Sequence, residues 1–455
     1  MAWTRNVMRV NLTTGSIARE ALNMEWAAQY LGQRGLATKY FVEEVDPKVD
    51  PLSPENKMIM TTGPLTGTIA STGGRYSVVT KGPLTGAIAC SNSGGFIGAE
   101  MKFAGWDMII FEGKSAEPVY LYIENEKAEL RPADAIWGKS VWAADEWLHK
   151  HHQDPQLKIA CVGRAAEQGS LYAAIVNDLH RAAGRSGVGT VMASKNLKAV
   201  AIRGTQGGAK IKDPKRFLQT TREQKQVLAE NAVTGQGLPK YGTQVLMNVI
   251  NEIGALPTRN MREVQFEEAS KISGEAMHEP RASDGKPNLT TNGACFGCTI
   301  ACGRISTVDR GHFTIENKPE YWGASGGLEY ENAWSLGADT GIGDLDAITY
   351  VNFLCNEDGL DPISFGATVA AAMELYEMGV LTSEHTGGIE LKFGSAKALV
   401  QCAELTVKGE VFGRELGMGS RRLCAKYGHP ELSMTVKGQE FPAFDPRGIQ
   451  GMGLT

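Results

Sequence analysis

The chain has 455 residues, and this length predicts two or three domains. Apolar residues make up 42% of it, which is enough for packed cores and excludes a wholly disordered protein. The 46 basic and 51 acidic residues give a formal net charge of −5, so we expect no binding to nucleic acid. Glycine is over-represented, with 54 residues, or about 12% against a usual value of roughly 7%.

The first 205 residues are predicted to form a β-rich domain. A strand, a Thr-Gly turn and a second strand make residues 8–20 a hairpin, and one segment, 142–152, has helical periodicity. Further short runs are rich in β-forming residues and are bounded by Gly or Pro. They cover residues 57–67, 75–86, 106–114, 119–125, 157–163 and 197–204.

Two similar segments follow one another in this domain. GPLTGTIASTGGR begins at Gly63, and GPLTGAIACSNSGG begins at Gly82, 19 residues later. One interpretation is two neighbouring hairpins with similar turns. The other is a pair of loops that present backbone N–H groups to one ligand, because glycine lets a backbone approach a phosphate closely.

From about residue 206 the pattern changes to helices, over 213–232, 344–359, 367–379, 395–409 and 414–428. The last four of these segments end at a glycine, which is typical of helix C-termini. The sequence therefore predicts an α+β protein, with a helical domain over 206–415 and the start of a second helical domain over 416–455. Because the chain ends in the Gly-rich segment 445–455, we expect the natural protein to continue and this last domain to be incomplete.

Three of the eight cysteines lie close together, in the pattern Cys295-x2-Cys298-x3-Cys302. Such short spacers let three thiolates converge on an iron–sulfur cluster, and four thiolates are the usual complement of [4Fe–4S]. Zinc is one alternative, although it usually takes two cysteine pairs or Cys and His at set spacings. A chance grouping of cysteines that binds no metal is the other. The fourth ligand lies beyond residue 455 or comes from a distant cysteine. The distant candidates are Cys355, Cys402 and Cys424.

Residues 177–190, NDLHRAAGRSGVGT, contain two arginines and three glycines beside a predicted strand. Arginine binds phosphate through two hydrogen bonds, and glycine allows a close approach, so this composition suits a phosphate site. The segment is not a Walker A motif, because no Lys-Ser/Thr pair follows the glycines, and it is not G-x-G-x-x-G. A Gly-rich turn with no ligand is the alternative.

These features, together with other stretches, make the chain resemble the tungsten-containing aldehyde:ferredoxin oxidoreductase family. The number and order of the matching stretches make the resemblance specific. Besides the cysteine segment they are RNVMRVNLTTG at 5–15, TTGPLTG at 61–67, SNSGGFIGAEMKFAGWDMIIFEGK at 91–114, HRAAGRSGVGTVMASKNLKAVAIRG at 180–204, KPEYW at 318–322, LCNEDGLDPIS at 354–364 and VKGQEFPAFDPRGIQGMGL at 436–454.

The resemblance implies a β-rich cradle that holds a tungsten bis-pterin cofactor (tungstopterin), with a [4Fe–4S] cluster nearby. It implies that backbone carbonyls of Asn92 and Ala182 hold a Mg²⁺ ion shared by the two pterin phosphates, in keeping with the preference of Mg²⁺ for oxygen ligands. Arg75 would lie between pterin and cluster. The residues implied to line the cofactor are Arg75, Asn92, Gly94 and Gly95 on one side and Arg181, Ala182, Gly184 and Arg185 on another.

Glu320 follows Cys302 by 18 residues and matches a family glutamate beside the metal. Oxidation of an aldehyde to an acid takes up an oxygen from water, so the resemblance implies that this carboxylate accepts a proton. A surface or capping carboxylate is the alternative.

Residues 356–361, NEDGLD, match the family's pterin motif D-x-x-G-L-D, although Asn356 replaces its first Asp. An amide can still bond a pterin ring, because it both donates and accepts. The alternative is a helix C-cap at Gly359 and an Asp before a Pro turn. The residues implied to bind pterin are Asn356, Gly359, Leu360 and Asp361. The family's second pterin motif, fourth cluster cysteine and active-site histidine follow the GMGL segment, outside these 455 residues.

The resemblance thus implies an enzyme that oxidises aldehydes to carboxylic acids with water and passes electrons through the cluster to ferredoxin or to an iron–sulfur subunit. The alternatives are a tungsten-dependent reductase subunit of the benzoyl-CoA reductase type and a non-catalytic, metal-stabilised binding protein. Molybdenum is an alternative metal, because pterin binds both metals alike. No run of about 18 apolar residues and no secretory signal is present, so we expect a cytoplasmic protein without a membrane span, and an oligomer.

Overall fold

The computed structural model describes residues 3–454, which separate into two compact units. The first unit comprises Met1–Glu230, Ala294–Thr299 and Asn356–Leu360. The second comprises Asn231–Gly293, Ile300–Cys355 and Asp361–Thr455. Two short segments from the second half of the sequence therefore belong to the β-rich unit. The domain boundaries expected after residues 205 and 415 stay predictions.

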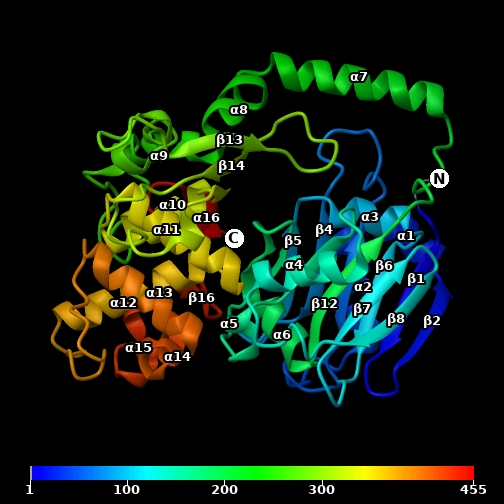
Figure 1. Ribbon diagram of the computed structural model, residues 1–455, viewed down its shortest axis with the longest axis horizontal. Coiled ribbons are helices and arrows are strands. Elements are labelled where there is room, and N and C mark those ends of the chain that lie inside the picture. The colour runs from blue at the N-terminus through cyan, green and yellow to red at the C-terminus, as the bar shows by residue number, and fades with distance from the viewer. Residues whose placement is uncertain (1–2, 455) are drawn as a thin grey trace. The chain divides into compact units, whose positions relative to one another are not determined.

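Six strands of the first unit form a sheet with the order β2-β1-β6-β3-β4-β5. Figure 1 labels β1, β2, β4, β5 and β6 of this sheet. They are β1 (Asn6–Asn11), β2 (Ser16–Ala21), β3 (Met58–Thr62), β4 (Tyr76–Lys81), β5 (Ile88–Ser93) and β6 (Met108–Glu112). β1 and β6 run parallel, and all other neighbours run antiparallel. The central strands β3, β4 and β6 are buried along almost their whole length, which explains why their sequences are largely apolar rather than alternating.

A second six-stranded sheet of the same unit has the order β11-β10-β9-β12-β7-β8. Its strands are β7 (Val119–Glu124), β8 (Lys127–Pro132), β9 (Lys158–Cys161), β10 (Ile175–Asn177), β11 (Arg181–Ala183) and β12 (Leu197–Arg203). β7 and β12 run parallel, and the other neighbours run antiparallel. Read in chain order, this sheet repeats the topology of the first, strand for strand.

A short helix comes just before the sixth strand of each sheet in the chain. In the first sheet α3 (Ile97–Phe103) precedes β6, and in the second α6 (Val188–Ser194) precedes β12. α3 contacts β3 of the first sheet and β9 and β12 of the second, whereas α6 contacts β3 and β4 as well as β10 and β12. The two helices therefore lie between the sheets. The loop before each helix, which follows β5 or β11, is the glycine-rich segment singled out in the sequence.

Other helices cover the outer faces of the sheets. The first sheet packs against α1 (Met24–Tyr30) and α2 (Gln33–Glu44), and the second against α4 (Val141–His152). Val141, Ala144 and Leu148 of α4 recur at helical spacing and are fully buried in the core of the second sheet. The remaining helices of this unit are α5 (Arg164–Glu167), η1 (Arg185–Gly187) and α7 (Pro214–Glu230).

The second unit is mainly helical and is built around α12 (Pro362–Glu377), which contacts α10, α13, α14 and α15 and is buried on nearly all sides. Its α-helices are α8 (Leu238–Tyr241), α9 (Leu246–Glu252), α10 (Tyr330–Leu336), α11 (Leu345–Asp358, whose last turn belongs to the first unit), α13 (Ala396–Lys408), α14 (Val411–Leu416), α15 (Ser420–Lys426) and α16 (Gln450–Leu454).

Short elements complete this unit. They are the strands β13 (Leu289–Gly293), β14 (Gly303–Ser306), β15 (Ser325–Gly326), β16 (Thr435–Val436) and β17 (Gln439–Glu440) and the turns of 3-10 or π helix η2 (Ala232–Gly237), η3 (Gly242–Val245), η4 (Ala269–Ile272), η5 (Ala276–His278), η6 (Pro319–Tyr321), η7 (Ala338–Thr340) and η8 (Pro430–Leu432).

The α+β class expected from the sequence is confirmed. Two helix predictions need correction. The helix expected from residue 367 already begins at Pro362, because the Asp361 carboxylate accepts a hydrogen bond from the Ile363 N–H (3.0 Å) and caps it. The helix expected over 414–428 is divided into α14 and α15, because two of the residues between them are glycines.

Among the residues that the structure describes, no helix combines the length and the hydropathy needed to cross a membrane.

Candidate active site

The loop after β5 carries the first group of expected site residues. Asn92 lies in β5 opposite Ser77, whose hydroxyl donates a hydrogen bond to Asn92 Oδ1 (2.5 Å). Gly94 and Gly95 follow directly and are buried. Gly95 has φ +83°, and a Cβ there would lie 2.1 Å from Asp178 Oδ2, so both its conformation and its surroundings require glycine.

The hairpin of β10 and β11 carries the second group. Arg181 and Ala182 begin β11, where they pair with Asn177 and Val176 of β10, and both are half-buried. β11 in turn contacts β5. The two groups of residues, which come from topologically equivalent places in the two sheets, are therefore neighbours.

The loop after β11 packs against the first sheet as well. The Arg185 N–H donates to Ser91 Oγ of β5 (3.1 Å). Gly187 has φ +78°, and a Cβ there would lie 2.0 Å from the carbonyl oxygen of Leu171. Gly184 and Arg185, which belong to the same loop, are half-buried. All eight residues implied to line the cofactor from the β-rich half thus belong to one unit.

These residues fit a cofactor with phosphate groups. Arg181 and Arg185 are half-buried and Arg75 is exposed, so one unit supplies three guanidinium groups that can pair with anions. Gly94 and Gly95 are instead required by packing, because Cys295 and Asp178 occupy the positions that their Cβ atoms would take. The arginines are therefore the part of this site that suits phosphate recognition.

The 19-residue sequence repeat has a simple structural origin. The first copy, residues 63–75, connects β3 to β4. The second copy, residues 82–95, comprises the connection from β4 to β5, the strand β5 and the two glycines after it. Their glycine-rich ends nevertheless meet, because a Cβ on Gly74 would lie 2.6 Å from the carbonyl oxygen of Gly95. The equivalent partner of the loop after β5 is the loop after β11, which the sequence comparison did not identify.

The first two cysteines of the predicted cluster sit on this glycine-rich surface. The Phe296 N–H donates to the carbonyl oxygen of Gly95 (3.1 Å), and the Cys298 N–H donates to that of Cys295 (3.1 Å). A Cβ on Gly94 would lie 2.6 Å from Cys295 Sγ. Both cysteines are unbridged and half-buried, in a compact loop that suits thiolate ligands.

The distant cysteines differ in environment. Cys402 and Cys424 are buried, and burial raises the pKa of each thiol to about 12, which disfavours the thiolate needed for metal binding. Cys355 is also buried. Within residues 3–454, no three His, Cys, Asp or Glu side chains already stand in positions to hold a metal ion. The cluster at the three cysteines stays a prediction.

The segment Asn356–Leu360 belongs to the first unit and packs against the second sheet. The Ala174 N–H donates to the carbonyl oxygen of Gly359 (2.7 Å), and Leu360 forms an isolated bridge with Ala173. Asp358 is buried and pairs with Arg164 through two contacts (2.5 and 3.0 Å), yet burial raises its pKa to about 6. Gly359, with φ +72°, directly follows Asp358, the last residue of α11, as a glycine at a helix C-terminus does.

Comparison with known proteins identifies the family. Residues 7–204 match the N-terminal domain of aldehyde ferredoxin oxidoreductase, and residues 219–455 match domains 2 and 3. The chain belongs to the aldehyde ferredoxin oxidoreductase family. The resemblance stated from the sequence is therefore confirmed, and the protein is an oxidoreductase of this family.

The tungsten-containing aldehyde ferredoxin oxidoreductases of Pyrococcus furiosus and Thermococcus kodakarensis are both 48% identical to the chain over 453 residues, which is 99% of this chain and 72% of each relative. A solved structure, the active-site complex BamBC of benzoyl-coenzyme A reductase with 1,5-dienoyl-CoA, matches with a TM-score of 0.83 and 28% identity. That match covers 97% of this chain and 66% of the solved chain, so the chain spans just under two thirds of it.

The other expected site residues of this family member lie in the second unit. Glu320 is exposed in the single turn η6 (Pro319–Tyr321). The neighbouring Lys318 donates to Glu404 Oε1 (2.6 Å) and to the Tyr350 hydroxyl (2.8 Å), which fixes the turn to α11 and α13. Cys302 is half-buried just before β14, and Asp361 is the N-cap of α12.

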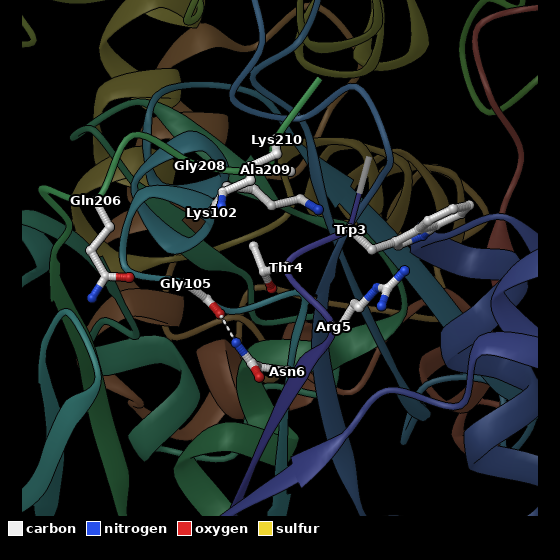
Figure 2. A pocket seen from close by; sticks show the side chains of 10 residues that line it. All are labelled: Trp3, Thr4, Arg5, Asn6, Lys102, Gly105, Gln206, Gly208, Ala209 and Lys210. Carbon is white, nitrogen blue, oxygen red and sulfur yellow. Dashed lines mark hydrogen bonds between the residues drawn. The ribbon is translucent and has the colours of Figure 1, made fainter. Parts of the chain in front are cut away.

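A cavity of about 430 Å³ opens beside the first strand of this family member (Figure 2). Figure 2 shows Asn6 donating across it to the carbonyl oxygen of Gly105, a distance of 2.9 Å. Lys102 is fully buried at its wall and pairs with Asp107. None of the residues expected to bind the cofactor lines this cavity.

The sequence reading missed several residues that hold the site together. Arg164 and Asp358 form the ion pair behind the pterin motif, and Asn177, Asp178 and Tyr76 form a hydrogen-bond network behind the glycine-rich loop. Asn177 and Asp178 open the segment 177–190, for which the sequence predicts a phosphate site or a Gly-rich turn and no role for these two side chains. Tyr76 and Gly94, which bond to Asn177, are 101 and 83 positions away, so no local signal marks these contacts.

Proposed function

We propose that the protein oxidises an aldehyde to a carboxylic acid at a tungsten bis-pterin centre and transfers the electrons through a [4Fe–4S] cluster. One observation carries this proposal. The segment 94–96 contacts the arginine-bearing β10–β11 hairpin on one side and the Cys295 loop on the other. The proposed phosphate cradle and the proposed cluster cysteines would thus share these three residues.

When bound, the tungsten centre supplies two-electron oxidation of the substrate and the cluster supplies a path for single electrons. Arg181 and Arg185 would bind the phosphates by charge-assisted hydrogen bonds. The carbonyl oxygens of Asn92 and Ala182 would serve a Mg²⁺ ion. Arg75 would lie between pterin and cluster as a fixed cation, and its positive charge would tune electron transfer between the two.

Pterin would be bound from the other side by the motif residues of Asn356–Leu360 and by Asp361. Gly359 is held against β10 through its carbonyl oxygen, which positions the backbone of the motif. The Asn356 amide can donate to or accept from the pterin ring. The cluster would be held by Cys295, Cys298 and Cys302 as thiolates.

Glu320 would take a proton from water as the carboxylic acid forms. The carboxylate is exposed on the turn η6, where water can reach it. The bonds of Lys318 to Glu404 and Tyr350 fix the turn that carries it. A fixed turn lowers the conformational entropy that the base would lose on reaching its working position.

We further propose that the electron acceptor is ferredoxin or an iron–sulfur subunit, and that the protein works in the cytoplasm as an oligomer. The relatives whose names include ferredoxin support the acceptor.

Metal and activity measurements on the protein purified anaerobically from its native host, grown with tungstate, test the proposal. We expect about one tungsten and about four iron atoms per chain, and benzaldehyde-dependent reduction of a viologen dye. Zinc without tungsten, and no turnover, would contradict the enzyme and favour a metal-stabilised binding protein. Molybdenum in place of tungsten would correct the metal but leave the chemistry.

A reductase of the benzoyl-CoA type is the second candidate, because the chain matches the solved benzoyl-coenzyme A reductase complex with a TM-score of 0.83. Aldehyde oxidation is preferred, since identity is 48% to the aldehyde enzymes and 28% to that complex. Protein that contains tungsten and iron but does not oxidise benzaldehyde would favour the reductase.

A further inference from the structure

Asn177, the last residue of β10, is only 1% exposed and uses its amide fully. Its Oδ1 accepts hydrogen bonds from the hydroxyls of Tyr76 (3.1 Å) and Ser93 (2.7 Å). Its Nδ2 donates to the carbonyl oxygen of Gly94 (3.0 Å) and to Asp178 Oδ2 (2.7 Å). The amide is therefore fixed in one orientation, because any rotation would leave buried polar groups unsatisfied.

Asp178 begins a strained turn. Asp178 and Leu179 have φ values of 49° and 64°, in the left-handed region that such residues rarely adopt. Asp178 Oδ2 accepts a second hydrogen bond, from the Phe96 N–H (2.9 Å). Since strain of this kind persists only where surrounding contacts offset it, the turn and the segment 94–96 stabilise each other.

The same segment supports the cysteine loop from its other side. The Phe296 N–H donates to the carbonyl oxygen of Gly95 (3.1 Å), and the rings of Phe96 and Phe296 meet edge to face at 6.5 Å. A Cβ on Gly94 would lie 2.6 Å from Cys295 Sγ. A movement of residues 94–96 must therefore change the surroundings of this sulfur.

We propose that Asn177 and Asp178 are positioning residues that fix residues 94–96 against Cys295 and thereby set the reduction potential of the cluster. This inference rests on the proposed function, because it requires a cluster at the cysteine loop. Neither residue touches the reacting atoms. Asn177 acts through the three-residue segment that the cofactor loop and the cysteine loop share, and Asp178 acts through this segment and through its negative charge.

The direction of the effect follows from electrostatics. The reduced cluster carries one more negative charge than the oxidised cluster, so water that enters beside a cluster sulfur favours the reduced form. Loss of the Asn177 amide frees the Gly94 carbonyl and loosens this packing. Replacement of Asp178 by Asn removes a nearby negative charge, while its side-chain oxygen can still accept from Phe96. Both changes raise the reduction potential.

The experiment compares wild type, Asn177→Ala, Asp178→Asn and a control, Asn56→Ala, in the anaerobically purified protein. Asn56 is also a fully buried asparagine, and its Nδ2 donates to Pro51, Thr80 and Lys81 at the far end of β4. Iron content is measured first, and the cluster is then titrated with EPR detection. We expect at least a tenfold shift toward reduced cluster at fixed potential in both site variants, which is about 59 mV for one electron.

The outcomes distinguish a failure of the proposed function from a failure of the positioning role of Asn177 and Asp178. Wild type without a cluster signal overturns the proposed function itself. If wild type has the cluster and both site variants titrate like the Asn56→Ala control, the positioning role is wrong. If Asn177→Ala loses its iron altogether, the reduction potential of the Asp178→Asn variant decides whether the proposal holds, because this variant keeps the hydrogen-bond acceptor and differs from wild type by one charge.

Discussion

Replacing Gly163 by alanine tests the contact between the loop after β9 and the pterin-motif segment. Gly163 has φ −94° and ψ −171°, a conformation that alanine adopts freely, so the substitution adds only a methyl group. That Cβ would lie 2.3 Å from both the carbonyl carbon and the oxygen of Asp358, and 2.8 Å from its Cα. All three are backbone atoms, which cannot rotate aside as a side chain can.

The magnitude follows from the separation that the methyl group requires. Ordinary contact for a Cβ begins at 3.4 Å, so the two backbones must move apart by about 1 Å. This movement stretches the Ala174–Gly359 hydrogen bond of 2.7 Å and the Arg164–Asp358 ion pair. Overpacking costs about 1–3 kcal/mol, and a weakened buried hydrogen bond costs about 1 kcal/mol more. We expect the free energy of unfolding of the first unit to fall by about 2–4 kcal/mol.

For a unit of this size, that loss lowers the unfolding midpoint by about 5–15 °C. Differential scanning calorimetry of the purified chain measures it, and pterin content measures the effect on the motif. Gly169→Ala is the matched control. Gly163 precedes the short helix α5 and Gly169 follows it, and Gly169 has φ +83° and nothing within 4 Å of its Cβ. This control should lose only about 1–2 kcal/mol, from backbone conformation. A Gly163→Ala midpoint equal to that of wild type would refute the contact.

Three further predictions concern other parts of the chain. Cys298→Ala should lower iron content sharply, and wild-type iron in this variant would show that the cysteine does not bind the cluster. Lys318→Met should lower kcat about tenfold or more with little change in KM, because the turn of Glu320 loses its anchor; an equal rise in KM instead would indicate a substrate-binding role. Burial lowers the pKa of His152 to about 4, so between pH 6.5 and 4 the unfolded chain binds a proton that the folded chain does not, and stability falls as pH falls. His152→Phe should remove about 1 kcal/mol of this pH-dependent loss of stability, a value already lowered to account for the partial exposure of His152. If the free energy of unfolding, measured in urea, changes equally between pH 7 and pH 5 for wild type and His152→Phe, the prediction is wrong.

Local chemistry near the site could be predicted from the sequence. Glycine-rich loops after β5 and β11 were expected, because Gly94, Gly95 and Gly187 stand in short runs that follow β-forming residues. Helix C-termini at Gly409 and Gly359 were also expected, and both glycines have left-handed φ values. In each case the signal lies within a few residues of the feature that it predicts.

Contacts between distant segments could not be predicted in this way. Asn177 and Gly94 are 83 positions apart, and Arg164 and Asp358 are 194 apart. Each pair is a polar contact between short segments, buried for Asn177 and Gly94 and partly buried for Arg164 and Asp358. Neither hydrophobic periodicity nor turn chemistry relates the two partners. The family resemblance identified the motif of residues 356–361 but not the arginine that pairs with it.

The topological duplication of the first unit explains why the site has two glycine-rich loops. In each sheet the fifth strand leads into a loop and a short helix whose second residue is glycine, Gly98 in α3 and Gly189 in α6. A Cβ at either would lie within 2.7 Å of a backbone carbonyl oxygen, of Gly74 and of Ala174 respectively, so both helices approach neighbouring backbone equally closely. Two equivalent loops suit a ligand with two equivalent halves, as a bis-pterin cofactor is.

The symmetry of these loops is broken by the cysteine segment. Ala294–Thr299 packs against the first loop, where Phe296 is bonded to Gly95 and Cys295 abuts Gly94. The corresponding loop after β11 instead packs on Ser91 through the Arg185 N–H. One half of the duplicated cradle therefore packs against the cysteine segment and the other does not. With cofactor and cluster bound as we propose, only the loop after β5 would lie beside the cluster, so the duplicated site would be asymmetric toward electron transfer.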